Sequence, residues 1–188
     1  MPRLIAMVLL LAGLVLSAPA LARDLENTLY LDLPAGRVVI EMRPDLAPRH
    51  VARIKELARQ GFYDGIPFHR VIDGFMAQTG DPTGTGAGGS GRTLPLESSE
   101  EKHERGIVSM ARGSSPNSAD SQFFIMYGRR PGLDRLYTVW GRVVEGMEHV
   151  DALKKGDTAA DGMVEAPDRI VRLRVAADVE AGRPDAVR

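Results

Sequence analysis

The chain has 188 residues, with 24 basic and 25 acidic side chains and a formal net charge of −1 at pH 7. Hydrophobic residues make up 44% and charged residues 26%, a globular composition unlike that of disordered or collagen-like chains. Because the charge is balanced, the composition gives no electrostatic reason to expect nucleic acid or an anionic membrane as a partner. Since cysteine is absent, disulfides, cysteine nucleophiles, thiolate zinc sites and iron–sulfur clusters are excluded.

The first 22 residues have the pattern of a secretory signal peptide. Arg3 is their only charge, the stretch 4–16 is apolar apart from one glycine, and Ala20-Leu21-Ala22 is a small-x-small cleavage site. This apolar run of about 13 residues is too short for the roughly 20 that span a bilayer. We therefore expect cleavage near Ala22, one domain over residues 23–188, and a periplasmic or secreted product without membrane attachment.

Short stretches rich in β-branched and aromatic residues dominate the rest of the chain. Their pattern predicts a hairpin over 28–33 and 37–42, and apolar residues at helical spacing predict a helix from Pro48 to Gly61. A second helix is predicted around Gly146 to Lys154. Further strands are expected at 68–72, 75–79, 106–110, 123–127, 137–143 and 169–175. Eight short strands with two helices predict a mainly β fold, an antiparallel barrel or sandwich with helical lids.

The glycine-rich stretch Gly84 to Gly89 formally matches G-x-G-x-x-G. A dinucleotide site needs a helix directly after this motif, and the residues up to Pro95 cannot begin one. We interpret the stretch as a flexible surface loop. The histidines lack the spacing of metal ligands, so neither a metal site nor a cofactor is predicted. They are His50, His69, His103 and His149.

Two segments, Phe68 to Asp81 and Ser121 to Ile125, are not explained by packing alone. In a barrel whose strands alternate sides, Arg70, Phe75 and Gln78 cannot all be core residues. Together the segments resemble the cyclophilin family of peptidyl-prolyl cis-trans isomerases, over about 27–175. The resemblance rests on the ordered blocks Phe62-Tyr63-Asp64-Gly65, Phe68-His69-Arg70-Val71-Ile72, Gly74-Phe75-Met76, Gln78-Thr79-Gly80-Asp81, Ser121-Gln122-Phe123-Phe124-Ile125 and Val139-Trp140-Gly141-Arg142-Val143.

The resemblance implies an eight-stranded antiparallel closed barrel capped by two α-helices, with substrate on the outer face beside the glycine-rich loop. It implies a monomeric enzyme that accelerates X-Pro isomerisation and assists folding. Its partners would be proline-containing peptides and unfolded or folding exported proteins. By motif position, the catalytic residues would be Arg70, Phe75, Gln78, Phe124 and Tyr137, and the substrate-binding residues Met76, Ala111, Arg112, Gln122 and Leu133.

Three positions depart from the commonest eukaryotic cyclophilin pattern. Gly132 stands where a tryptophan often lies, which implies weak cyclosporin binding. Tyr137 replaces a histidine and can still pack on proline and donate one hydrogen bond. Arg112 replaces an asparagine, and its side chain would favour acidic residues flanking the substrate proline. These departures keep open a binding module of the same fold, a holdase with weak catalysis.

Arg70 suits the expected reaction because a permanently protonated donor can stabilise the prolyl nitrogen of a twisted X-Pro bond. Its alternative role is a structural ion pair with a nearby acid, which predicts loss of stability rather than of activity. A third alternative for the whole chain is a lipocalin-like ligand barrel. We disfavour it because bulky residues, among them Phe123 and Ile125, are available to fill the interior.

Overall fold

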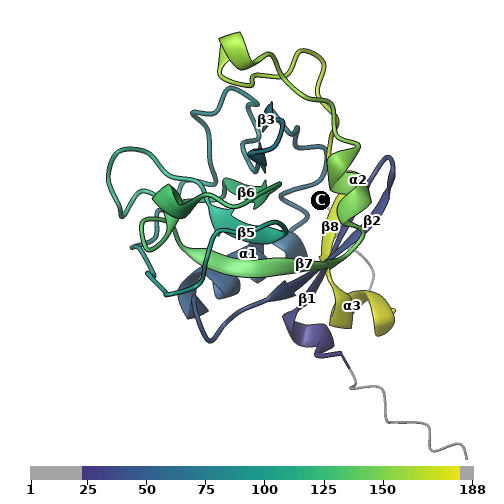
Figure 1. Ribbon diagram of the computed structural model, residues 1–188. Coiled ribbons are helices and arrows are strands. Elements are labelled where there is room, and N and C mark those ends of the chain that lie inside the picture. The colour runs from purple at the N-terminus through teal and green to yellow at the C-terminus, as the bar shows by residue number, and fades with distance from the viewer. Residues whose placement is uncertain (1–22, 183–188) are drawn as a thin grey trace, which may run out of the picture.

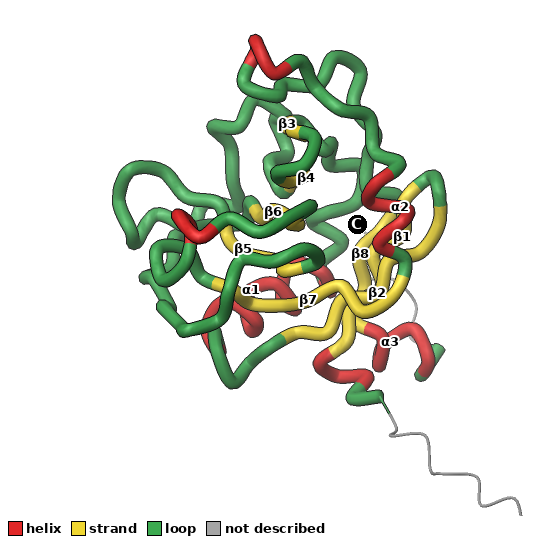
Figure 2. The backbone as a smooth tube through the Cα atoms, in the orientation of Figure 1, coloured by secondary structure: helices red, strands yellow, loops and turns green. Residues whose placement is uncertain are grey.

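The computed structural model describes residues 23–182, so the predicted signal peptide lies outside the described residues. Mainly β structure is confirmed, with eight strands in the described chain (Figures 1 and 2). The strands are β1 (Thr28–Leu33), β2 (Gly36–Met42), β3 (Arg70–Ile72), β4 (Met76–Thr79), β5 (Ile107–Met110), β6 (Phe123–Met126), β7 (Val139–Glu145) and β8 (Arg172–Val175). The helices are α1 (Pro48–Arg59), α2 (Met147–Asp151) and α3 (Ala176–Glu180), with 3-10 turns η1 (Leu25–Asn27), η2 (Pro131–Leu133) and η3 (Thr158–Ala160).

The strands form one antiparallel sheet in the order β3-β4-β6-β5-β7-β2-β1-β8. The expected closed barrel is wrong, because β3 and β8 end the sheet without pairing and the sheet curls into an open half-barrel. Irregular backbone bonds cross the gap instead: Phe68 N–H donates to Asp168 at 2.9 Å and Val71 N–H to Gly162 at 2.8 Å. A chain segment without regular strand geometry therefore fills the place of the missing β3–β8 ladder.

The two predicted helices are present, and a third was missed. Pro48 occupies the first turn of α1, where the missing N–H costs no hydrogen bond, and the buried face includes Val51, Ile54 and Leu57. The third helix, α3, follows β8 directly. Its five residues are too few for a helical period to stand out in the sequence.

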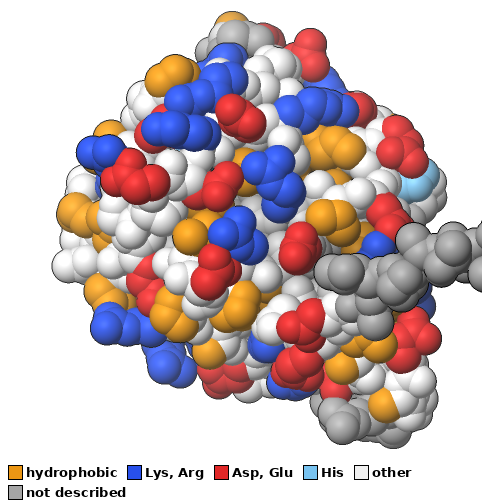
Figure 3. All heavy atoms as spheres, turned by 60° about the horizontal axis from the view of Figure 1, so that its bottom comes forward, with side chains coloured by type: hydrophobic (Ala, Val, Ile, Leu, Met, Phe, Trp, Pro, Cys, Tyr) orange, Lys and Arg blue, Asp and Glu red, His pale blue; other side chains and the backbone are white. Residues whose placement is uncertain are grey.

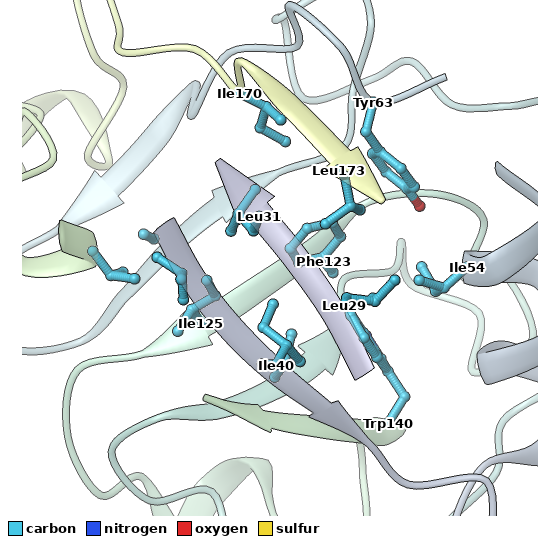
Figure 4. Packing of buried hydrophobic residues seen from close by; sticks show 14 of the residues in the cluster. Leu29, Leu31, Ile40, Ile54, Tyr63, Phe123, Ile125, Trp140, Ile170 and Leu173 are labelled. Atoms are coloured by element: carbon cyan, nitrogen blue, oxygen red, sulfur yellow. The ribbon is translucent and has the colours of Figure 1, made fainter. Parts of the chain in front are cut away.

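The interior of the half-barrel is filled with large side chains (Figure 4). Phe123 lies edge-to-face with Trp140, at 5.4 Å between ring centroids, and with Tyr63 at 5.6 Å. Leu29 and Ile40, from β1 and β2, pack into the same cluster (Figure 4). This packed interior leaves no room for a lipocalin-like ligand cavity.

Alternation along β6 places a second, smaller apolar cluster on the outer face of the sheet. Phe123 and Ile125 point into the core, so Phe124 and Met126 point outward, where Met76 and Val139 join them. Phe75, Leu133 and Tyr137 pack on this cluster while staying partly exposed. The sheet thus carries an apolar surface on its outer side, between β4, β5 and β6.

On the face shown in Figure 3, basic and acidic side chains are interspersed. In the described part of the chain, no helix is both long enough and apolar enough to cross a membrane.

Candidate active site

A pocket of about 150 Å³ opens on the outer apolar cluster, and we call it the Phe124 pocket. It brings together all but one of the site residues expected from the sequence. Its lining consists of Arg70, Phe75, Met76, Gln78, Ala111, Arg112, Phe124, Leu133 and Tyr137. The exception, Gln122, lines an adjoining groove of about 410 Å³ between the glycine-rich loop and Arg112, which we call the glycine-loop groove.

Strand register explains why distant residues meet in the Phe124 pocket. Arg70 on β3 pairs with Gln78 on β4, and Gln78 pairs with Phe124 on β6. Paired residues share a face of the sheet, so the three side chains form one outward row across adjacent strands. Tyr137 closes the wall, with its ring edge-to-face to that of Phe124 at 5.9 Å. A cation, an amide and an apolar wall therefore lie side by side.

The Arg70 guanidinium is held from one side. Its Nε donates to the backbone carbonyl of Asp161 at 2.8 Å, and its Nη2 donates to the Asp161 carboxylate at 2.9 Å. The remaining nitrogen, Nη1, has only longer contacts, at 3.4 Å to Gln78 Oε1 and 4.0 Å to Met76 Sδ. Since Gln78 and Met76 both line the Phe124 pocket, one charged N–H group faces the pocket.

Asp161 is a site residue that the sequence reasoning missed. It lies 91 positions from Arg70, and its side chain is 80% exposed. Its φ of 53° and the φ of +76° at Gly162 fold the backbone so that carbonyl and carboxylate reach the same guanidinium. A Cβ at Gly162 would lie 2.3 Å from Ile72, so this turn requires glycine. The Asp-Gly turn signal was available in the sequence, but not its contact with Arg70.

The ion pair lowers the pKa of the Asp161 carboxyl below its usual value, because the Arg70 guanidinium donates a hydrogen bond to it. The sequence left open, as an alternative role for Arg70, an ion pair with a nearby acid, and Arg70 does form such a pair with Asp161. However, an ion pair with so exposed a carboxylate adds little to stability. Its clearer effect is geometric, since it fixes two of the three guanidinium nitrogens.

Gln122 links the row of outward residues to the glycine-rich loop. Its Oε1 accepts from Gln78 Nε2 at 2.8 Å, and its Nε2 donates to the carbonyls of Gly86 and Gly88 at 2.9 and 2.8 Å. The Gln78 amide is thereby fixed beside Arg70. The side chain of Gln122 is committed to these contacts.

Buried Asp81 anchors the glycine-rich loop. Burial alone would raise the pKa of its carboxyl. Hydrogen bonds from the Thr83 side chain and from the backbone N–H groups of Gly88, Thr83 and Gly86 instead lower it to about 2. A Cβ at Gly88 would lie 2.1 Å from the Asp81 carboxylate. The glycines therefore permit backbone contact with a carboxylate of the chain itself, and the loop is more tethered than its composition suggests.

His103 is a second residue that sequence reasoning did not place at the site. Its buried ring stacks on Phe124 with centroids 6.2 Å apart, and its Nε2 lies 3.1 Å from Ser109 Oγ. Burial lowers the pKa of the His103 imidazole, and the hydrogen bond with Asp134 opposes that effect. His103 thus supports the pocket wall from behind as a neutral ring at pH 7.

Two arginines flank the aromatic walls. The Arg112 guanidinium lies over the Tyr137 ring, 4.6 Å from its centroid, and the Arg130 guanidinium lies 5.2 Å from the Phe75 centroid. Gly132, in η2, has open space where a side chain would project. Within residues 23–182, no cluster of three or more His, Cys, Asp or Glu side chains could hold a metal ion.

An apolar pocket beside one fixed guanidinium, on the outside of an antiparallel half-barrel, has the form of a binding site for an extended peptide. A family model described as "Cyclophilin type peptidyl-prolyl cis-trans isomerase/CLD" matches residues 28–175. The chain belongs to the cyclophilin family and is a peptidyl-prolyl cis-trans isomerase.

The relatives come from bacteria and eukaryotes. A "Probable peptidyl-prolyl cis-trans isomerase" of Brucella suis is 51% identical over 173 residues, covering 86% of this chain and 88% of the relative. "Peptidyl-prolyl cis-trans isomerase B" of Bacillus subtilis is 41% identical, covering 74% and 99%.

Two solved structures have the same fold. A cyclophilin of Hirschia baltica matches with a TM-score of 0.73 at 30% identity, covering 82% of this chain and 76% of that one. A cyclophilin type isomerase of Cryptosporidium parvum, crystallised in the presence of the dipeptide Ala-Pro, matches with a TM-score of 0.73 at 32% identity. That match covers 79% of this chain and 98% of the other.

Proposed function

We propose that the Phe124 pocket binds the proline ring of X-Pro peptides and that Arg70 catalyses their isomerisation by donating a hydrogen bond to the prolyl nitrogen. The observation that carries the proposal is the Nη1 group of Arg70, which faces the pocket while Asp161 holds the other two nitrogens. The Ala-Pro dipeptide of the Cryptosporidium relative supports a proline-containing ligand.

The chemistry requires a donor rather than an acid or base. Rotation about a peptide bond has a barrier of about 18–20 kcal/mol, which arises from amide resonance. At the twisted transition state the nitrogen lone pair is localised and accepts a hydrogen bond well. A fixed donor such as Arg70 therefore stabilises the transition state more than either planar isomer. Because arginine remains protonated, the step needs no titrating group.

The other residues of the site would bind and orient the substrate. Phe75, Met76, Phe124 and Leu133 would hold the pyrrolidine ring and exclude the water that favours the planar, more polar amide. Tyr137 would pack on the proline and donate one hydrogen bond. Gln78, whose amide Gln122 holds in place, would anchor the substrate backbone. The segment formed by Ala111 and Arg112 would lie along the peptide.

Replacing Arg70 tests the proposal. We expect Arg70→Ala to lower kcat/KM for an Ala-Pro peptide about 10²- to 10³-fold, as for loss of one transition-state donor, with little change in Tm. NMR exchange spectroscopy measures the cis/trans rate directly, and calorimetry measures Tm. The NMR measurement also separates an isomerase from a holdase of the same fold, since a pure binder shifts the peptide signals without accelerating cis/trans exchange.

Two further variants make the result interpretable. Arg70→Lys keeps the charge but loses the planar fork that engages Asp161, and we expect it to remain strongly impaired. Arg105→Ala removes a comparable surface ion pair, with Asp151, and we expect full activity. Full activity of a folded Arg70→Ala enzyme would overturn the catalytic assignment.

We also propose that the enzyme acts on exported proteins, on the strength of the leader pattern in residues 1–22. Uncatalysed X-Pro isomerisation takes tens to hundreds of seconds, long enough to limit folding after export. In a bacterial expression host, the full-length chain should yield a periplasmic or secreted product that begins near Arg23. Recovery of the uncleaved chain from the cytoplasm would contradict this part of the proposal.

A further inference from the structure

We propose that this enzyme selects X-Pro segments with carboxylate side chains on both sides of the proline, and that Arg112 and Arg130 bind these carboxylates. The inference rests on the proposed binding of the proline in the Phe124 pocket. It concerns the substrate class rather than the chemical step.

Arg112 presents a positive charge that no carboxylate of the described residues neutralises. Its Nε and Nη2 both donate to the backbone carbonyl of Leu136 at 3.2 Å, and its Nη1 donates to that of Gly113 at 2.9 Å. These contacts lay the guanidinium flat on the Tyr137 ring. Arg112 lines both the Phe124 pocket and the glycine-loop groove, so its charge lies at their junction.

Arg130 repeats this arrangement at the Phe75 wall. Its Nη2 donates to the carbonyl of Gly74 at 3.1 Å and its Nη1 to that of Arg129, also at 3.1 Å, while the guanidinium lies over the Phe75 ring. The side chain is exposed. Carbonyl and ring contacts orient both guanidinium groups and leave both charges available to a ligand.

Most arginines within residues 23–182 have an acidic partner. Arg37, Arg59, Arg105, Arg129, Arg135 and Arg174, among others, each form an ion pair with a carboxylate. Within residues 23–182, Arg112 and Arg130 form none. Arg49 and Arg169 also form none, but among these four only Arg112 and Arg130 lie over aromatic rings of the Phe124 pocket.

The acidic groups around the site are mostly committed elsewhere. Asp161 pairs with Arg70, and Asp134 pairs with Arg129 and His103. Asp120 accepts from the backbone N–H groups of residues 90, 91 and 92. Asp73, exposed beside Gly74, forms no ion pair with Arg130 within the described residues. Among the described residues, Arg112 and Arg130 are therefore two cations beside the Phe124 pocket without a carboxylate partner.

A bound peptide can supply those counter-charges. With its proline ring in the Phe124 pocket, an extended segment leaves the pocket in two directions, advancing about 3.3 Å per residue. Side chains one or two residues from the proline are then within reach of the Tyr137 and Phe75 walls. Carboxylates accept from guanidinium groups in the strongest pairing available to arginine. Acidic flanks are therefore the complementary substrate.

The test compares three blocked heptapeptides in which the residues two before and two after an Ala-Pro bond are Glu, Gln or Lys. By NMR exchange, we expect kcat/KM to fall in the order Glu, Gln, Lys, with about a two- to fivefold preference for each ion pair formed. Arg112→Gln and Arg130→Gln should each lower the Glu-to-Gln ratio, and the double variant should bring it to about one. Arg49→Gln, a matched charge loss on α1, should leave the ratio unchanged.

Salt gives an independent readout. At 1 M NaCl the Debye length is about 3 Å, so the preference for Glu should largely disappear while the Gln peptide is little affected. Equal rates for the three peptides, or an unchanged ratio in the double variant, would overturn the inference. The ratio is measured on the wild-type enzyme, so it does not depend on the Arg70 assignment. If Arg70→Ala remained active, the proposed catalytic role of Arg70 would be wrong, but the measured preference for acidic flanks would be unaffected.

Discussion

At the residue scale, the sequence motifs predicted which side chains would meet but not what holds them in place. The resemblance to the cyclophilin motifs placed Arg70, Gln78 and Phe124 in one site, and the strand register brings the three into one row. Asp161 could not be placed there, because its contact with Arg70 depends on the path of a loop 91 positions away. His103 was missed for a similar reason, since a lone histidine carries no signal of the ring that it supports. Motifs therefore locate the residues that line the pocket, whereas the residues that position them become visible only in the fold.

Asp161 provides a prediction at this scale. We expect Asp161→Ala to lower kcat about three- to tenfold with KM and Tm nearly unchanged, because the Arg70 guanidinium loses a fixed partner without loss of buried packing. Asp161→Asn should recover part of the rate, since its amide oxygen can still accept from Nη2. Peptide exchange kinetics and calorimetry measure both quantities. A fall in Tm with unchanged kcat would make Asp161 merely structural.

At the scale of elements, the predicted strands and two helices were confirmed within about two residues at most ends, but strand closure was not. The stretches 68–72 and 169–175 read as full strands, yet regular structure begins only at Arg70 and Arg172. The residues before these points make single bridges, such as that between Pro67 and Arg169, rather than a ladder. Apolar alternation measures burial, and it cannot distinguish a ladder from irregular pairing.

The glycine-rich loop was likewise predicted only in part. Its composition indicated a loop, and the loop is present. What the composition did not reveal is that buried Asp81 draws its backbone N–H groups together. A glycine-rich turn around a carboxylate of the chain has the same sequence signal as one around an external anion.

At the scale of the whole molecule, three buried histidines should make stability depend on pH. They are His50, His69 and His103. Burial lowers the pKa of each imidazole, although Glu97, Asp81 and Asp134 respectively oppose the effect. The unfolded chain therefore binds protons more readily than the folded one once the pH falls to about 6.5. Folding free energy should be fully present above that value and decline below it.

We accordingly expect Tm to be nearly constant between about pH 7 and 8 and to fall progressively from about pH 6.5 to 5. Calorimetry across this range measures the slope. His103→Gln should reduce the slope, because it removes one of the buried imidazoles whose pKa is lowered. A Tm that rises as the pH is lowered would contradict the assignment of these groups as buried and neutral.

The ends of the described chain pack against each other on the outside of β1. The Tyr30 hydroxyl donates to Glu180 Oε1 at 3.2 Å, and Leu25 from η1 and Val179 from α3 join the same small cluster. The Phe124 pocket lies elsewhere, on the outward side of β3, β4 and β6; Figure 1 shows the positions of β3, β6 and α3. No residue of α3 lines the pocket, so a carrier or solid support joined to the C-terminal end would be attached next to an element that takes no part in it. Immobilised at that point, the enzyme would keep its pocket open to clients in solution.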